Sequence, residues 1–224
     1  MRHFLSSPST RPAKRPTRRQ LLVGGLLLTS LAACGRAQAP APLPANARVL
    51  ALGDSLTAGQ GAAREQSWPA RLQALSGWLV TNAGRNGDTS SGALARLPGL
   101  LADTRYDAIL IGIGGNDMLH SVPREQTLAN LRAMLALARE HTRHVALLAT
   151  PQPDIWRASM GQLQDAPFYS EIADESGVLP IPDVYSRTLS QPRLRADQIH
   201  ANAQGYAEIA QALYEALGAA GWRP

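Results

Sequence analysis

From Arg48 onward, short apolar runs alternate with longer amphipathic segments, and this alternation restricts the chain to a few architectures. Five runs have the length and composition of buried strands: Val49–Leu52, Leu79–Asn82, Ala108–Ile113, Val145–Thr150 and Val178–Ile181. Five helices are predicted among them: Trp68–Leu75, Thr89–Leu101, Arg124–His141, Phe168–Ser176 and Ala203–Leu217. Strands that alternate with helices are joined by right-handed crossovers, so the sequence predicts an α/β domain with a parallel sheet of about five strands.

Polar motifs follow the first three predicted strands, at the carboxyl ends where such sheets carry their functional residues. Gly53-Asp54-Ser55-Leu56 follows the first strand, and Gly53 permits the tight turn on which a serine nucleophile must be presented. Residues 82–88 follow the second strand, and Gly114-Gly115-Asn116-Asp117 follows the third. A glycine amide of the former and the Asn116 side chain can donate to an oxyanion, whereas Asp117 is expected to hold its loop. Each motif taken alone is also typical of an ordinary turn.

A carboxylate and an imidazole lie close together near the carboxyl end, in Asp197-Gln198-Ile199-His200. A separation of three residues lets the carboxylate reach Nδ1 of the ring, which leaves Nε2 free to act as the base for Ser55. The pair alone could equally be a solvated loop carboxylate and a surface histidine. Together with the three strand-end motifs, it predicts an acyl-transfer site.

These motifs resemble the conserved blocks of the SGNH/GDSL hydrolases. Ser55 lies in GDSL, Gly87 in NGDTS, Asn116 in GGND and His200 in DQIH, and Asp197 matches the carboxylate of the family. The likeness extends from Arg48 to Leu217. It is greatest to the bacterial acyl-CoA thioesterase/lysophospholipase/arylesterase group, through LALGDSLTAG, WPARL, NAGRNGDTSSGALARLPGLL and GIGGND.

The resemblance implies a three-layer α/β/α, flavodoxin-like fold and a catalytic triad of Ser55, His200 and Asp197. It also implies an oxyanion hole formed by Ser55, Gly87 and Asn116, a periplasmic location, and no metal or organic cofactor. The expected substrates are small-molecule or lipid esters and thioesters, such as aryl esters, lysophospholipids and acyl thioesters.

Two features depart from the family pattern. Ala201 stands where the family often has proline, and residues 151–161 (PQPDIWRASMG) do not match the expected loop. Four apolar side chains on the loops after the third and fourth strands are candidates for an acyl pocket, with packing in the core as the alternative: Met118, Leu119, Ile155 and Trp156.

Two other functions use the same residues. The apparatus can remove acetyl groups from a sugar or cell-wall polymer, and an open groove in place of an apolar slot would favour that reaction. A non-catalytic binding lipoprotein is less favoured, because serine, asparagine, aspartate and histidine are all retained. A flavodoxin-like nucleotide binder is disfavoured because the sequence lacks a glycine loop of the phosphate-binding pattern.

The distribution of charge argues against nucleic acid as a partner. The net charge is +5, but six of the 22 Lys and Arg residues lie in residues 1–34, which contain no Asp or Glu. The remainder carries 16 basic and 17 acidic residues, a net charge of −1. A nearly neutral domain lacks the basic surface that binds a polyanion.

Residues 1–34 are predicted to be an export signal. Six basic residues precede the apolar run Leu21–Ala33, which is too short to span a bilayer. The Arg18-Arg19 pair resembles a twin-arginine signal, and the general secretory route remains open.

The single cysteine, Cys34, follows Leu31-Ala32-Ala33 and resembles the lipidated cysteine of a lipobox. The alternative is an incidental cysteine in a cleaved signal. Residues 35–47, rich in Pro and Ala, are predicted to tether residues 48–224, the hydrolase domain. The sequence therefore predicts a periplasmic lipoprotein held at a membrane through Cys34. It leaves the oligomeric state open, with a monomer as the expectation.

Overall fold

Five parallel strands form a single sheet in the order β2-β1-β3-β4-β5. The strands are β1 (Arg48–Gly53), β2 (Leu79–Gly84), β3 (Ala108–Gly112), β4 (His144–Leu148) and β5 (Leu179–Ile181). The computed structural model describes residues 41–223. The predicted signal peptide, Cys34 and the first part of the predicted tether lie outside the described residues. All five predicted strands are present, and the predicted parallel α/β fold is confirmed.

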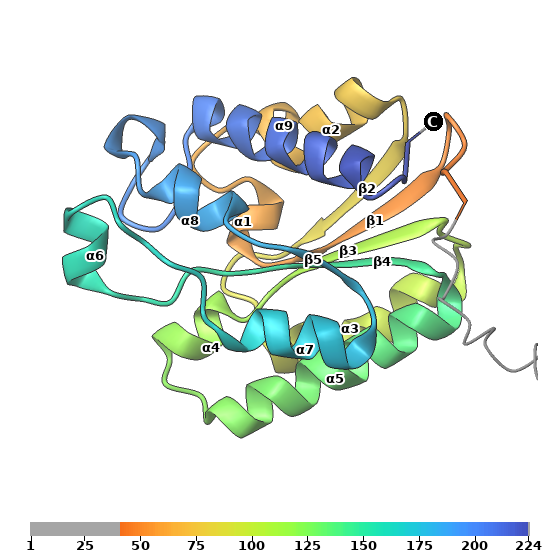
Figure 1. Cartoon of the computed structure of the whole chain (residues 1–224), viewed down its shortest axis with the longest axis horizontal. Coiled ribbons are helices and arrows are strands. Elements are labelled where there is room, and N and C mark those ends of the chain that lie inside the picture. Colours follow the sequence, from red (N-terminus) through yellow and green to blue (C-terminus); the bar gives the residue numbers. More distant parts are fainter. Residues whose placement is uncertain (1–40, 224) are drawn as a thin grey trace, which may run out of the picture. The chain divides into compact units, whose positions relative to one another are not determined.

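Helices cover both faces of the sheet, which gives three layers (Figure 1). One face carries α2 (Trp68–Ser76), α8 (Val184–Leu189) and α9 (Ala203–Ala219). The other carries α3 (Ser90–Ala102), α5 (Arg124–His141) and α7 (Phe168–Ser176). The five long predicted helices correspond to α2, α3, α5, α7 and α9.

The alternation of side chains along the central strands explains the two layers of helices. In β3, Ala108 and Leu110 pack with the α2 and α9 face, whereas Ile109 and Ile111 pack with the α3 and α5 face. All four side chains are fully buried. A strand covered on both sides must be apolar at every position, which is why it appears in the sequence as an unbroken apolar run.

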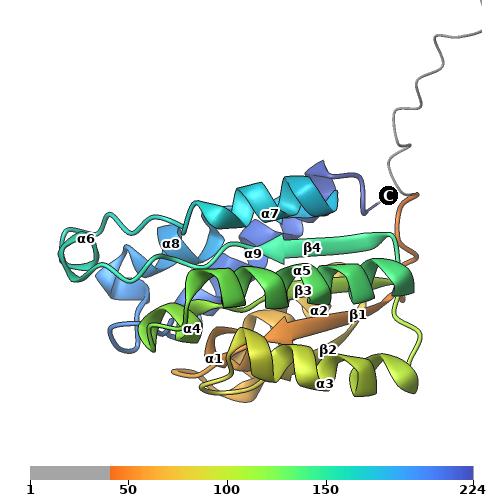
Figure 2. The ribbon, with the colours of Figure 1, turned by 90° about the horizontal axis from the view of Figure 1, so that it is seen from below.

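Several short helical segments follow the strands and were not predicted. They are α1 (Ser55–Ala58), α4 (Gly115–Leu119), α6 (Ile155–Ser159) and the 3₁₀ helices η1 (Arg64–Gln66) and η2 (Pro192–Leu194), together with α8. Segments of three to six residues complete too few helical turns to show a period in the sequence. In Figure 2 the arrowheads of the strands point toward the end of the molecule where α1, α4 and α6 lie.

Chain packing begins a few residues before the boundary predicted at residue 48. Leu43 is buried against the α2 and α9 layer, and its backbone N–H donates to the carbonyl of Trp222 at 2.9 Å. The carbonyl of Ala41 lies 2.8 Å from Nε2 of His144, the first residue of β4. The amino-terminal end of the described chain is therefore fixed at the edge where the strands begin, opposite α6 (Figures 1 and 2). Within residues 41–223, no helix combines the length and the apolar character needed to cross a membrane.

Candidate active site

The turn between β1 and α1 presents Ser55 at the carboxyl edge of the sheet. Gly53 ends β1, and a Cβ atom there would overlap the carbonyl oxygen of Gly112 on the neighbouring strand as well as the Thr57 hydroxyl. The side chain of Asp54 caps α1, since its Oδ1 accepts the N–H of Leu56 at 3.0 Å. Ser55 is the first residue of this helix and its side chain reaches the cavity described below.

Ser55, His200 and Asp197 form a continuous hydrogen-bonded chain. Ser55 Oγ lies 2.9 Å from His200 Nε2, and His200 Nδ1 lies 2.7 Å from Asp197 Oδ2. The serine and the histidine are 145 positions apart in the sequence. These distances match those of a nucleophile paired with an imidazole base that a carboxylate orients.

Both oxygens of the Asp197 carboxylate are engaged. Oδ2 contacts the histidine ring, and Oδ1 accepts the backbone N–H groups of Ile199 at 2.9 Å and His200 at 2.8 Å. Burial alone would raise the pKa of Asp197, but the hydrogen bonds from the His200 ring and the two amides outweigh it and lower the pKa below its usual value. The carboxylate is therefore ionised near neutral pH and can stabilise a positively charged His200.

The loop that carries His200, residues 194–202, is closed by hydrogen bonds on both sides. Ala196 N–H donates to the His200 carbonyl and Asn202 N–H donates to the Leu194 carbonyl, each at 2.9 Å. The Asn202 side chain caps α9 and also donates to the carbonyl of Arg195. The family-typical proline is replaced by Ala201, which is fully buried here, so this loop is held by its hydrogen bonds without the proline ring.

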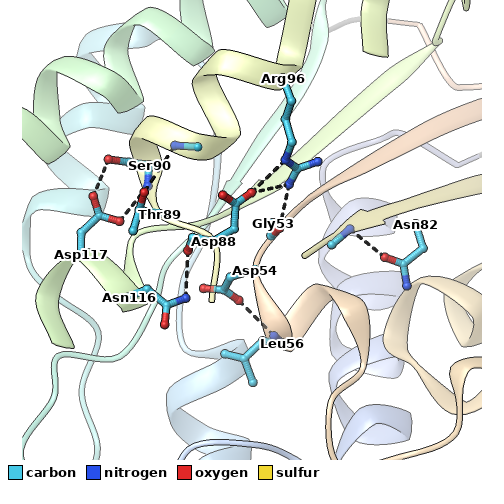
Figure 3. Close-up of polar contacts among 12 residues, drawn as sticks. Gly53, Asp54, Leu56, Asn82, Asp88, Thr89, Ser90, Arg96, Asn116 and Asp117 are labelled. Carbon is cyan, nitrogen blue, oxygen red and sulfur yellow. Dashed lines mark hydrogen bonds and ion pairs between the residues drawn. The ribbon is translucent and has the colours of Figure 1, made fainter. Parts of the chain in front are cut away.

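Two of the predicted oxyanion donors are Asn116, in α4, and Gly87, in the loop after β2, and these two segments contact each other. Asn116 Nδ2 donates to the carbonyl of Asp88 at 2.8 Å (Figure 3), which occupies one of its two N–H groups. Gly87 directly precedes Asp88 and has a left-handed φ of +74°, a conformation that favours glycine. Ser55 and Asn116 both lie on the wall of the cavity next to the serine hydroxyl.

Two carboxylates, one buried and one largely buried, fix these loops to the fold (Figure 3). Asp117 accepts the backbone N–H of Ser90 at 2.8 Å and its hydroxyl at 2.5 Å, which joins α4 to the start of α3. Asp88 forms an ion pair of 2.8 Å with Arg96, and the same guanidinium donates to the Gly53 carbonyl at 3.0 Å. The serine turn, the Gly87 loop and the Asn116 loop are therefore connected to one another. Asp117 holds its loop, as the sequence predicts.

Asp54 is the most perturbed acid of the site. Its carboxyl is only 4% exposed, and burial raises its pKa to about 7, an effect that the nearby Asp88 and Asp117 charges increase and the Leu56 N–H partly offsets. A neutral carboxylic acid therefore lies beside Ser55 up to nearly neutral pH. This burial could not be predicted from the sequence, because the residue follows a strand in a polar turn.

A cavity of about 580 Å³ adjoins Ser55 and His200, a volume suited to a small-molecule ligand. Most of its wall is apolar and comes from five separate segments of loop or short helix. The apolar residues are Leu56, Leu119, Pro151, Pro153, Ile155, Ala158, Leu163, Leu189 and Ile199.

The four side chains predicted to line an acyl pocket separate into two groups. Leu119 and Ile155 lie on the cavity wall. Met118 packs against the core on the α3 and α5 side, and Trp156 is 79% exposed and away from the wall. The other wall residues were not singled out from the sequence. Arg195 and Gln198 could have been suspected, because both lie within two residues of Asp197 or His200.

Comparison with known proteins identifies the family. The profile of the GDSL-like lipase/acylhydrolase family matches residues 51–208. The chain belongs to this family. It is thus a hydrolase that acts on ester bonds, and the resemblance noted in the sequence is confirmed.

Individual relatives are named as esterases or thioesterases. The esterase TesA of Pseudomonas aeruginosa is 34% identical over 166 residues, which cover 65% of this chain and 83% of the esterase. The thioesterase 1/protease 1/lysophospholipase L1 of Escherichia coli K12 is 33% identical over 160 residues, or 69% of this chain and 75% of that protein. A crystal structure of TesA matches with a TM-score of 0.68 at 28% identity, covering 77% of this chain and 99% of the other.

Because the Asp54 carboxyl is protonated in the fold, we expect the free energy of unfolding to decrease as the pH rises. In the unfolded chain the carboxyl ionises near pH 3.8, whereas in the fold it stays protonated to about pH 7, so stability is lost as the pH rises between these values. Asp54→Asn removes this dependence and keeps an acceptor for Leu56. We expect its melting temperature to exceed that of the wild type by several degrees at pH 8, and the difference to shrink toward pH 4, in circular dichroism melts.

The control is Asp103→Asn, which changes an exposed carboxylate at the end of α3. Its difference from the wild type should be the same at both pH values. A pH-independent difference for Asp54→Asn as well would contradict the protonated carboxyl.

Proposed function

We propose that the protein hydrolyses carboxylic esters and thioesters through an acyl-enzyme formed on Ser55. The observation that carries the proposal is the hydrogen-bonded chain from Ser55 Oγ through His200 to Asp197. His200 Nε2 takes the hydroxyl proton while Ser55 Oγ attacks the carbonyl carbon, and Asp197 stabilises the imidazolium. His200 then gives the proton to the leaving alcohol or thiol, and water releases the acid by the same steps.

The oxyanion of the tetrahedral intermediate needs hydrogen-bond donors that are already in place. We propose the backbone N–H groups of Ser55 and Gly87 and the second N–H of the Asn116 side chain. Support comes from the contact between Asn116 and the Asp88 carbonyl, which ties two of these donors together. The ion pair between Asp88 and Arg96 adds a further constraint on the same loop.

The cavity supports a substrate with an apolar acyl chain. Its wall is mostly carbon, and Leu119, Ile155 and Leu163 belong to it. A sugar polymer would need an open groove with many hydrogen-bonding groups, so the wall disfavours the alternative of a carbohydrate acetylesterase. The complete hydrogen-bonded chain at Ser55 disfavours a non-catalytic binding protein.

Removal of the proposed nucleophile should abolish turnover. Ser55→Ala is expected to lower kcat by at least about 10⁴-fold on p-nitrophenyl esters from acetyl to palmitoyl, because no other hydroxyl is activated by His200. The wild type should show an optimum at one chain length, set by the cavity. A fluorophosphonate should label the wild type once, as seen by intact mass, and leave Ser55→Ala unlabelled.

Ser170→Ala is the matched control, because this exposed hydroxyl only donates to the Pro167 carbonyl. It should keep both turnover and labelling. Retention of activity in Ser55→Ala would refute the nucleophile.

Loss of the proposed side-chain oxyanion donor should reduce the chemical step more than binding. Asn116→Ala is expected to lower kcat by about 10²–10³-fold with a small change in KM, since the donor acts on charge that develops in the transition state. Asn86→Ala, which removes an exposed amide from the neighbouring loop, should leave kcat close to wild type. An effect of Asn116→Ala confined to KM would contradict the assigned role.

We further propose that the protein is exported and held at a membrane by a lipid on Cys34. Support comes from the sequence alone, through the basic and apolar segments of residues 1–33 and the position of the single cysteine. In cell fractionation, the full chain should sediment with membranes, and Cys34→Ser should move to the soluble fraction because it has no lipid attachment site. Identical fractionation of both proteins would contradict the anchor.

A further inference from the structure

Arg195 is the only lysine or arginine on the cavity wall within the described residues. It is half-buried, and its guanidinium makes no ion pair with any carboxylate in residues 41–223. A guanidinium has five N–H donors and is unfavourable in a partly desolvated site unless an acceptor satisfies them. The guanidinium of Arg195 is therefore available to an acceptor that a ligand brings into the cavity.

The backbone of Arg195 is fixed relative to His200. Its N–H donates to the Pro192 carbonyl at 3.2 Å, and its carbonyl accepts from the Asn202 side chain at 3.2 Å. It is also paired with Ala201, the residue after His200, in an antiparallel bridge. Arg195 is thus held by the same closed loop that holds the proposed base.

The other ionisable groups on the wall do not neutralise Arg195. Asp154 is paired with Arg157 at 3.3 Å. Asp54 contacts the Leu56 amide, and its burial raises its pKa to about 7. His200 contacts Ser55 and Asp197, and the Asp197 carboxylate accepts its three hydrogen bonds from Ile199 and His200, not from Arg195. The cavity thus combines an apolar wall with one cation that lacks a protein partner among the described residues.

The chemistry of the proposed reaction assigns Arg195 to one end of the substrate. His200 must protonate the leaving atom, so the leaving group departs on the side of the histidine loop, residues 194–202. The acyl chain is expected along the carbon wall instead. We propose that Arg195 forms an anion-binding subsite for a phosphate or carboxylate on the leaving group of the ester, an inference that rests on the proposed function. A guanidinium suits both anions, because its fork of N–H groups matches two of their oxygens.

Paired substrates that share the acyl group, with a neutral leaving group in one member and an anionic leaving group in the other, test this subsite. The aryl pair is p-nitrophenyl butanoate and 3-carboxy-4-nitrophenyl butanoate. The thioester pair is decanoyl-N-acetylcysteamine and decanoyl-CoA, and the lipid pair is monooleoylglycerol and oleoyl lysophosphatidylglycerol. The three pairs distinguish a carboxylate, a nucleotide phosphate and a lipid headgroup phosphate as the source of the anion.

Arg195→Gln should lower kcat/KM on the charged member of at least one pair by roughly tenfold to a hundredfold, mostly through KM, and leave the neutral member unchanged. Arg195→Lys should recover part of the loss, since it keeps the charge without the fork. Arg193→Gln is the matched control. Its side chain contacts Gln191 and is absent from the cavity wall, so both members of each pair should react as in the wild type.

Equal losses on charged and neutral substrates would overturn the subsite and make Arg195 a support of the loop. No loss on any substrate would overturn it as well. If a variant fails to fold, a measurement on the wild type alone tests the proposal. The ratio of kcat/KM on the charged substrate to kcat/KM on the neutral one should decrease when NaCl is raised from 50 to 500 mM, because salt screens the attraction between Arg195 and the anion. A constant ratio would refute the proposal. Failure of the proposed function is distinguishable, because it would remove Ser55-dependent turnover of the neutral esters.

Discussion

The hydrogen bond between Ser55 Oγ and His200 Nε2 joins the two ends of the domain, and the packing of α9 on α2 makes it possible. Ser55 precedes α2 in the chain, and His200 immediately precedes α9. Both helices bury apolar side chains on the same face of the sheet, and the hydroxyl of Tyr206, near the start of α9, donates to the carbonyl of Gln60, which precedes α2, at 2.6 Å. The distance between Ser55 and His200 therefore depends on the packing of the α2 and α9 layer, because that packing determines where the histidine lies.

Ion pairs and hydrogen bonds of charged side chains hold the other loops around Ser55 in place. Asp88, Asp117 and Arg96 lie in largely buried surroundings. Arg96 bridges the Asp88 carboxylate and the Gly53 carbonyl, and Asp117 accepts from the Ser90 N–H and hydroxyl. Such networks are rigid, since breaking one contact leaves a buried polar group unpaired. The consequence at the serine is preorganisation: Gly53, Asp88 and Asn116 are linked before any ligand arrives. Preorganised donors act on developing charge without first having to reorient.

Much of this arrangement was predictable, and the exceptions have physical reasons. The five strands and the long helices could be predicted because buried faces impose a period on the sequence. Ser55 and Asn116 were singled out by motifs at strand ends, and His200 by its spacing from Asp197. Most residues of the cavity wall could not be predicted from the sequence. The helix α6 buries none of its residues, and a helix of five residues shows no apolar stripe. Trp156 accordingly points away although Ile155 faces the cavity. The burial of Asp54 and the isolation of Arg195 depend on neighbours distant in sequence.

The position of the amino-terminal end has a consequence for how the domain can be presented to its surroundings. Ala41 and Leu43 are fixed where the strands begin, whereas the opening beside Ser55 lies where they finish. A solid support or a reporter domain attached directly at Ala41 of residues 41–223 would therefore be joined at the end of the domain remote from the serine, where it does not obstruct the cavity.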